Sequence, residues 1–318
     1  MQQSTLFDID LIRRYDKAGP RYTSYPTAVQ FQSGFDEAAY REYAQSSNAT
    51  GNPLSLYVHL PFCDTVCFYC ACNKIATKNR SLAVPYVARL QHEMALQSAL
   101  FNRERPVTQL HWGGGTPTFL SHTEMRDLMQ GTRAHFQLLD DDSGEYSIEI
   151  DPRETKEDTI AFLRELGFNR MSLGVQDFDP NVQKAVNRIQ SEQQTFAVLE
   201  AARREGFKSV SIDLIYGLPH QSVDSFSNSL NNIFTVKPYR FSIFNYAHLP
   251  TRFKPQRRIN EADLPQPATK LAILQHTINH LIEAGYVYIG MDHFALPDDE
   301  LAIAQRNGTL YRNFQGYS

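Results

Sequence analysis

The segment Leu166-Gly167-Phe168-Asn169-Arg170 joins a stretch of helical periodicity to a run of β-forming residues through a single glycine. The same form recurs at Glu205-Gly206-Phe207-Lys208-Ser209 and at Ala284-Gly285-Tyr286-Val287-Tyr288. Glycine often ends a helix because it adopts the left-handed backbone conformation without a side-chain clash. Each segment therefore predicts a helix followed at once by a strand, and the repetition favours one repeated βα architecture over two unrelated domains.

Short β-rich runs alternate with longer helical segments along most of the chain, which predicts an α/β protein with a parallel sheet. The expected strands are Leu54–Leu60, Gln109–Trp112, Tyr146–Ile150, Arg170–Val175, Ser209–Ile215, Arg240–Asn245 and Tyr286–Met291. The expected helices are Val84–Phe101, Thr123–Phe136, Thr155–Leu166, Ser191–Glu205, Val223–Phe234 and Ala268–Ala284. A complete or partial (βα) barrel is our first choice and a doubly wound open sheet is the alternative, because periodicity does not show whether a sheet closes. In either fold, ligands bind at the C-terminal ends of the strands.

The composition excludes several classes of protein. The 318 residues are 42% hydrophobic, which provides a core without disulfides. Thirty-one basic and thirty-five acidic residues give a net charge of −4, with no polybasic tail, so a nucleic-acid partner is disfavoured. The N-terminus lacks a signal-peptide pattern, and no apolar run approaches the roughly 18 residues of a membrane span. We expect a cytoplasmic, monomeric protein without a membrane partner.

All four cysteines lie between Cys63 and Cys72, directly after the first expected strand. Such close cysteines do not link distant segments, so they indicate chemistry or metal binding in a reducing compartment. Cys63, Cys67 and Cys70 have C-x3-C-x2-C spacing, and three thiolates in one loop suit an iron-sulfur cluster. A [4Fe-4S] cluster held by three cysteines keeps one iron open for a substrate or cofactor. A zinc site formed by all four cysteines, or unliganded thiols, is the alternative.

Polar or glycine-rich residues also follow later strands. The run Gly113–Pro117 exposes backbone that a small polar ligand can approach closely, although a structural turn explains three glycines equally well. Glu149 and Asp151 share one face at the end of the third strand. A ligand-binding role suits Glu149, whereas Asp151, which precedes Pro152, better fits a solvated or helix-capping acid. Asp213 lies within an otherwise apolar strand and therefore needs a partner.

Histidines and a basic loop give weaker signals. His59 lies just before the cysteine loop, where a cluster contact and a core histidine are equally good explanations. Lone histidines near other strand ends are weak evidence by themselves; they are His111, His248 and His293. A basic stretch in a proline-containing loop could meet a polycarboxylate substrate, although a solvated loop is the better explanation; it comprises Arg252, Lys254, Arg257 and Arg258.

The C-x3-C-x2-C loop after the first strand resembles the signature of the radical S-adenosylmethionine (SAM) superfamily, which has a partial (βα) barrel. Segments on both sides of the loop, Tyr57–Cys63 and Cys70–Lys74, closely resemble the oxygen-independent coproporphyrinogen III oxidase (dehydrogenase) family of heme biosynthesis. Further matching segments are Arg21–Pro26, His111–Thr118, Gly174–Phe178, Asp213–Pro219, Phe244–Pro250 and Asn313–Tyr317. The resemblance thus covers nearly the whole chain.

The resemblance implies ligands at named positions. Cys63, Cys67 and Cys70 would bind a [4Fe-4S] cluster. The residues implied for the SAM on the cluster are Tyr57, Gly114, Gly115, Thr116 and Glu149, and those for a second SAM are Tyr69, Gln176, Arg188, Asp213 and Ala247. Tyr69 replaces an expected phenylalanine and adds a hydroxyl group. No general base is implied because SAM supplies the radical; Cys72 and His59 are the candidates for a further catalytic role.

The implied reaction is an oxidative decarboxylation. The reduced cluster would split SAM to methionine and a 5′-deoxyadenosyl radical, which would remove hydrogen from a propionate of coproporphyrinogen III. Loss of carbon dioxide and of one electron would leave a vinyl group, and two rounds would give protoporphyrinogen IX in anaerobic heme biosynthesis, with an unidentified electron donor and acceptor. The alternatives are a related radical-SAM-like heme chaperone and a non-catalytic iron-sulfur or redox-sensing protein. Cys70–Lys74 and Arg21–Pro26 favour the oxidase.

We expect residues 1–50 to form an N-terminal extension and residues 51–318 to form the barrel. The sequence ends at Ser318, immediately after Gln315-Gly316-Tyr317. The family has a further glycine-rich segment and a helical C-terminal domain that covers the substrate. We expect both to be absent from this chain, which would affect its activity.

Overall fold

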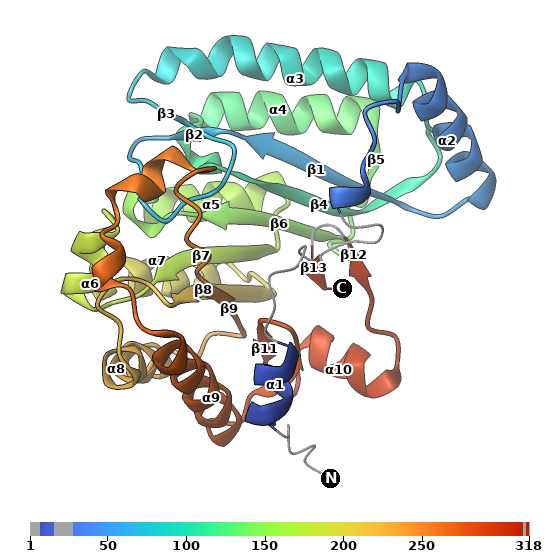
Figure 1. Ribbon diagram of the computed structural model, residues 1–318. Helices are drawn as coiled ribbons and strands as arrows, with labels where there is room; N and C mark the ends of the chain where they lie inside the picture. The colour runs from blue at the N-terminus through green and yellow to red at the C-terminus, as the bar shows by residue number, and fades with distance from the viewer. Residues whose placement is uncertain (1–6, 16–27, 314–315, 318) are drawn as a thin grey trace.

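The structure is a computed structural model that describes residues 7–15, 28–313 and 316–317. Its centre is a sheet with the strand order β1-β4-β6-β7-β8-β9-β11-β10, in which β5 adds beside β4 (Figure 1). These strands are β1 (Leu54–Leu60), β4 (Pro106–Gly114), β5 (Gln137–Leu138), β6 (Glu145–Ile150), β7 (Arg170–Gln176), β8 (Ser209–Tyr216), β9 (Arg240–Asn245), β10 (Val287–Gly290) and β11 (His293–Ala295). Two small pairs lie outside this sheet, β2 (Phe62–Cys63) with β3 (Ile75–Ala76) and β12 (Arg312–Asn313) with β13 (Gly316–Tyr317).

The helices that connect the parallel strands cover the outer face of the sheet (Figure 1). They are α3 (Ala83–Ser98), α4 (His122–His135), α5 (Glu157–Leu166), α7 (Glu192–Arg204), α8 (Val223–Phe234) and α9 (Pro267–Glu283). Helix α4 begins with a reciprocal capping box between Ser121 and Glu124, and α5 ends at Gly167, whose φ of 107° is left-handed. All six expected helices are present, with ends that differ from the prediction by at most three residues.

Further helical segments lie outside these connections. They are α1 (Ile9–Tyr15), α2 (Glu37–Thr50), α6 (Pro180–Ala185) and α10 (Glu300–Asn307), with short 3-10 turns at η1 (Ala28–Gln30), η2 (Arg80–Leu82), η3 (Pro117–Phe119), η4 (Pro152–Glu154), η5 (Lys254–Arg258) and η6 (Glu261–Asp263). Of these, α1 and α2 belong to the expected N-terminal extension. None of the described helices combines the length and apolar composition that a membrane span requires.

The far edge of the sheet differs from the prediction. Strands β1, β4, β6, β7, β8 and β9 run parallel, as expected, but the segment predicted as a seventh strand, Tyr286–Met291, does not lie next to β9. Its strand β10 turns back through Met291 and Asp292 into β11, which pairs antiparallel with both β10 and β9. A turn this short joins only antiparallel strands. The strand order is linear from β1 to β10 within the described residues, so the expected partial barrel is confirmed.

Side chains alternate between two environments along the strands. In β6 and β8, every second residue is fully or nearly buried against the outer helices, and the residues between them face the inside of the barrel. The outward set includes Trp112, Ile148 and Leu173, all without solvent exposure. The inward set is largely polar, so the barrel interior is suited to bind ligands rather than to form the core.

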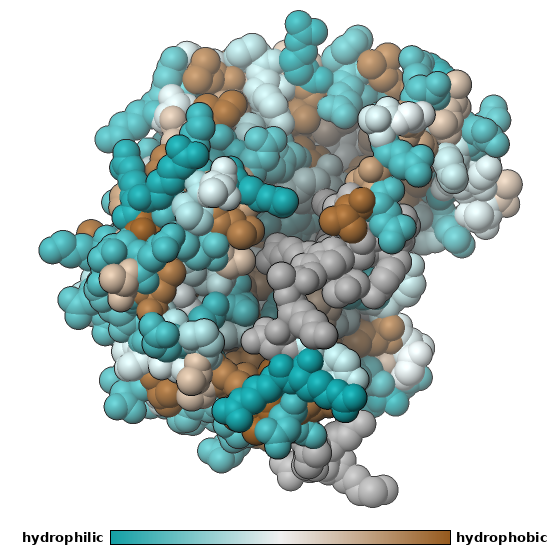
Figure 2. All heavy atoms as spheres, in the orientation of Figure 1, coloured by the Kyte–Doolittle hydropathy of each residue, from teal (hydrophilic) through white to brown (hydrophobic). Residues whose placement is uncertain are grey.

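The described surface in Figure 2 is mainly hydrophilic, with hydrophobic side chains in separate patches.

Some segments that carry the family resemblance lie outside the described residues: Arg21–Pro26, Phe314 and Gln315.

Candidate active site

A cavity of about 220 Å³ lies at the C-terminal ends of the parallel strands, as the fold predicts. It brings together eleven of the thirteen residues that the sequence indicated for the cluster and SAM. These are Cys63, Cys67, Tyr69, Cys70, Gly114, Gly115, Thr116, Glu149, Gln176, Arg188 and Asp213. Cys72 also lines it, together with Asp151 and Arg153. Segments more than 140 residues apart in sequence therefore converge on one site.

The cysteine loop is held in place from both sides. Its ends are joined by the β2–β3 pair, in which Thr77 N donates to Cys63 O at 2.9 Å. Its middle is bonded to the segment after α6, because Phe68 N donates to Val186 O at 2.9 Å and Asn187 Nδ2 donates to Val66 O at 2.8 Å. All four cysteines are free thiols. The chain itself thus fixes the path of the loop.

The three proposed ligand thiols have different surroundings. Burial raises the pKa of Cys63 to about 11. Hydrogen bonding with Cys72 and the nearby ammonium group of Lys74 outweigh burial at Cys70 and lower its pKa to about 6. Cys72 N donates to Cys70 Sγ at 3.4 Å, and Lys74 Nζ donates to Cys70 O at 3.1 Å. Cys72, whose role the sequence did not explain, therefore supports the thiolate form of Cys70.

Two arginines converge on the third thiol. Arg153 Nη2 lies 3.5 Å from Cys67 Sγ and Arg188 Nη1 lies 3.6 Å from it. Both guanidinium groups also pair with Asp151 Oδ2, at 2.7 and 3.1 Å respectively. The predicted capping role of Asp151 is present, since it accepts from Arg153 N, but the side chain is buried and ion-paired rather than solvated. Sequence reasoning missed Arg153; the signal was the cap at Asp151, because a cap of this kind turns the residue two positions later back over it.

The glycine run packs against the cysteine loop as well as facing the cavity. Gly115 N donates to Leu60 O at 2.8 Å and Thr116 N donates to Phe62 O at 2.7 Å. A Cβ atom on Gly115 would lie 2.6 Å from Phe62 O. Gly114 has a left-handed φ of 117°, and a Cβ there would lie 2.5 Å from the ring of His59. These glycines are thus required for close packing between two neighbouring loops, which the sequence did not show.

Glu149 is oriented by groups on the adjacent strand. Its Oε2 accepts from Gly114 N at 2.9 Å, and its Oε1 lies 3.4 Å from His111 Nε2. Burial raises the pKa of Glu149, but the hydrogen bond and charge of His111 and the amide of Gly114 outweigh it, so the pKa lies below its ordinary value. His111 is fixed in turn by Ser147 Oγ at 2.6 Å from its Nδ1. Glu149 is therefore an ionised acceptor at the wall of the cavity.

Two predicted ligands do not line this cavity. Tyr57 pairs with His111 in the strand register and stacks on its ring at a centroid distance of 5.7 Å, while its hydroxyl lies 3.1 Å from His59 Nδ1. Ala247 follows β9, and its carbonyl accepts from Gln256 Nε2 at 3.2 Å. Contacts of Tyr57 and Ala247 with SAM stay predictions.

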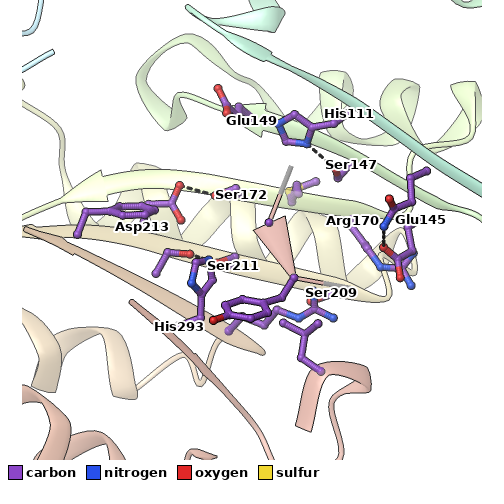
Figure 3. A pocket seen from close by; sticks show the side chains of 18 residues that line it. His111, Glu145, Ser147, Glu149, Arg170, Ser172, Ser209, Ser211, Asp213 and His293 are labelled. Carbon is purple, nitrogen blue, oxygen red and sulfur yellow. Dashed lines mark hydrogen bonds and ion pairs between the residues drawn. The ribbon is translucent and has the colours of Figure 1, made fainter. Parts of the chain in front are cut away.

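An inner chamber of about 230 Å³ extends from the site into the barrel (Figure 3). Glu149, Ser172 and Asp213 line both cavities. Ser172 Oγ donates to Asp213 Oδ2 at 2.5 Å, which provides the partner that the sequence required. Burial raises the pKa of Asp213 to about 6, although the hydroxyl of Ser172 opposes the shift. Serines from three strands, Ser147, Ser172 and Ser211, point toward the chamber, and His293 lies across from them (Figure 3).

The basic loop and the remaining histidines lie apart from the first cavity. Arg258 is 5.2 Å above the ring of Phe68, on the outer side of the cysteine loop. None of the four basic residues between positions 252 and 258 lines either cavity. His248 Nδ1 is hydrogen-bonded to the Tyr246 hydroxyl at 2.8 Å, and its Nε2 lies 3.3 Å from Glu261 Oε1. A role of this loop in binding substrate carboxylates stays a prediction.

The donor set fits a cluster and a polar cofactor. The three cysteines present soft sulfur ligands to one cavity. In the same cavity, Gln176 Oε1 and Arg188 Nε are buried without a hydrogen-bond partner in the described structure. Buried polar atoms of this kind indicate a missing ligand.

Comparisons with known proteins agree with this geometry. Residues 57–233 match the model of the radical SAM superfamily, so the chain is a radical SAM protein. It is 58% identical over all 318 residues to the oxygen-independent coproporphyrinogen III oxidase of Pseudomonas aeruginosa, covering 69% of that protein. For the Escherichia coli enzyme of the same name the identity is 52%, covering 98% of this chain and 67% of the relative. The solved structure of coproporphyrinogen III oxidase (HemN) from Escherichia coli superposes with a TM-score of 0.91 at 50% identity, over 98% of this chain and 69% of that one.

The chain belongs to the oxygen-independent coproporphyrinogen III oxidase family. It spans about two thirds of the length of these relatives. Membership confirms the predicted family, the oxidoreductase class and the use of a [4Fe-4S] cluster and SAM.

Proposed function

We propose that the barrel in this chain performs the radical oxidative decarboxylation of two propionates of coproporphyrinogen III, giving protoporphyrinogen IX in heme biosynthesis. The observation that carries the proposal is the convergence of three thiols, a glycine loop and two carboxylates, Glu149 and Asp213, on one cavity. A redox-sensing protein needs the thiols but not the polar side chains that line the same cavity, such as Glu149, Gln176 and Asp213. When bound, the reduced cluster and SAM supply the carbon radical that removes hydrogen from the substrate.

The proposed cluster ligands are Cys63, Cys67 and Cys70. Three cysteines leave one iron open, and this iron is where SAM would bind. Thr116 approaches the ligand set, because its Oγ1 lies 3.8 Å from Cys63 Sγ. Cys72 is proposed as a support of Cys70 rather than as a fourth iron ligand, since its own amide is directed at the Cys70 sulfur.

The polar side chains of the cavity are proposed to orient SAM. An ionised carboxylate such as Glu149 accepts hydrogen bonds from ribose hydroxyls or from an amino group. The amides of Gly114, Gly115 and Thr116 are bonded within the protein, so the glycine run is proposed to let SAM approach the backbone closely rather than to supply free donors. A second SAM is proposed beside Gln176 and Arg188, since each has a buried atom without a partner in the described structure.

We propose the division of the chain that the sequence indicated, with residues 1–50 as an extension and residues 51–318 as the barrel. The clustered free thiols support a reducing, cytoplasmic setting. The electron donor, the electron acceptor and the monomeric state stay predictions.

The test is anaerobic reconstitution of the chain with iron and sulfide, followed by reduction with dithionite in the presence of SAM and coproporphyrinogen III. Formation of 5′-deoxyadenosine together with a decarboxylated porphyrinogen is the expected result. A cluster-containing protein that gives neither compound would contradict the proposal, and tight binding of heme without decarboxylation would favour the chaperone. Cys67→Ala should remove the visible absorbance of the cluster, whereas the matched variant Cys72→Ala should retain most of it.

A further inference from the structure

The three proposed ligand thiols differ in what faces them. Cys67 Sγ has two guanidinium nitrogens within 3.6 Å, from Arg153 and Arg188. Cys63 Sγ faces the neutral hydroxyl of Thr116, and Cys70 Sγ accepts from the backbone of Cys72 and lies near the ammonium group of Lys74. Cys67 is therefore the thiol that faces two guanidinium groups, whereas a single ammonium group, that of Lys74, lies near Cys70.

The arginines are held rigidly by Asp151. Arg153 Nε donates to Asp151 Oδ1 at 3.0 Å and Arg153 Nη2 donates to Oδ2 at 2.7 Å, while Arg188 Nη1 donates to Oδ2 at 3.1 Å. Asp151 is 7% exposed and Arg188 is 6% exposed. Arg188 also donates to the carbonyl of Gly174. We call Asp151, Arg153 and Arg188 the arginine clamp. Its two cations and one anion give a net charge of +1 beside Cys67.

Arg153 has no other partner within the described structure. Every hydrogen bond of its guanidinium group goes to Asp151 or to Cys67. Its side chain is 15% exposed. Since all guanidinium hydrogen bonds of this cation go to one carboxylate and one thiol, its role is best explained by its electrostatic effect on that thiol.

We propose that the arginine clamp raises the reduction potential of the cluster bound through Cys67, with Arg153 as a dedicated tuning residue. The inference rests on the proposed ligation by Cys67. Reduction adds one electron to the cluster and breaks no bond, so the reduced form carries one more negative charge. A buried positive charge and N–H···S hydrogen bonds stabilise this form more than the oxidised one. The clamp thereby makes the cluster easier to reduce.

The signs of two substitutions test the inference. Arg153→Met changes the net charge of the clamp from +1 to 0 and should make reduction about tenfold less favourable, which lowers the midpoint potential of a one-electron couple by about 59 mV. Asp151→Asn changes the net charge from +1 to +2 and should shift the midpoint upward. Arg80→Met is the matched control, because Arg80 pairs with Asp64 of the same loop but touches no thiol. The measurement is a redox titration of the anaerobically reconstituted chain, followed by electron paramagnetic resonance.

The inference would be overturned if Arg153→Met, at full cluster content, changed the equilibrium constant for reduction of the cluster by less than twofold. A downward shift in both Arg153→Met and Asp151→Asn would also overturn it, because a purely structural role predicts the same direction for both. If Arg153→Met does not retain a cluster, Arg153→Lys decides, since it keeps the charge and should remain within about threefold of wild type in the same titration. If the unmodified chain forms no cluster, the proposed function fails instead, and the two failures are distinguishable.

Discussion

Gly115→Ala should separate the glycine run from the cysteine loop. The new Cβ atom would lie 2.6 Å from Phe62 O, where ordinary contact begins at 3.4 Å, so one of the two segments has to move by about 0.8 Å. The obstructing atom is a backbone oxygen, which no rotation of a side chain can relieve. The same oxygen accepts from Thr116 N at 2.7 Å, and the movement would lengthen this hydrogen bond. Overpacking of this kind costs about 1–3 kcal/mol.

Thermal unfolding of the apoprotein measures this loss, at about 2–4 °C for each kcal/mol in a domain of comparable size. Binding of SAM to the reconstituted protein, measured by equilibrium dialysis, should weaken as well, because Gly115 and Thr116 line the cavity proposed to hold SAM. Gly34→Ala is the control, since a Cβ there meets nothing within 4 Å. A Gly115→Ala protein that melts like wild type and binds SAM equally well would refute the packing argument.

Three further predictions concern carboxylates. Glu149→Gln should weaken SAM binding on the order of tenfold in the same dialysis, because an ionised acceptor of the Gly114 amide becomes neutral; unchanged binding would remove Glu149 from the site. The pKa of Asp213 is raised to about 6 in the folded protein, so protonated Asp213 contributes its full stabilisation below about pH 4. As the pH rises through about 6, the free energy of unfolding should fall by up to about 3 kcal/mol. Denaturant titrations of wild type and Asp213→Asn across this range should show the slope in wild type alone, and equal slopes would contradict the assignment. Asp177→Ala should lower the free energy of unfolding by about 2–4 kcal/mol, since Gln221 and Ser229 lose a buried acceptor at 2.5 and 2.7 Å; a change below about 0.5 kcal/mol would contradict this network.

The parallel strands could be predicted because glycine stops and alternating side chains are local signals. Their C-terminal ends meet at one edge in any βα sheet, which is why eleven separately chosen ligands converge on one cavity. Strand β11 could not be found in this way. Its three residues, His293–Ala295, are too few to show a period.

The contacts of Tyr57 and Arg153 could not be predicted from residue spacing, for a common reason. Tyr57 lies mid-strand opposite His111, so its side chain covers that neighbour instead of reaching the strand end. Arg153 contacts Cys67 across 86 residues of sequence. Such contacts depend on how turns aim side chains in three dimensions, which residue spacing does not record.

The hydrogen bonds from Phe68 to Val186 and from Asn187 to Val66 fix the cysteine loop through protein contacts alone. Ordering a backbone residue costs about 1–2 kcal/mol in conformational entropy, and these hydrogen bonds to the barrel would offset part of this cost whether or not the cluster is bound. The cluster would then be inserted into a loop that is already ordered. If oxygen destroyed the cluster, the hydrogen-bonded loop would keep its conformation. Recovery of the enzyme would then require delivery of iron and sulfide rather than refolding of the chain.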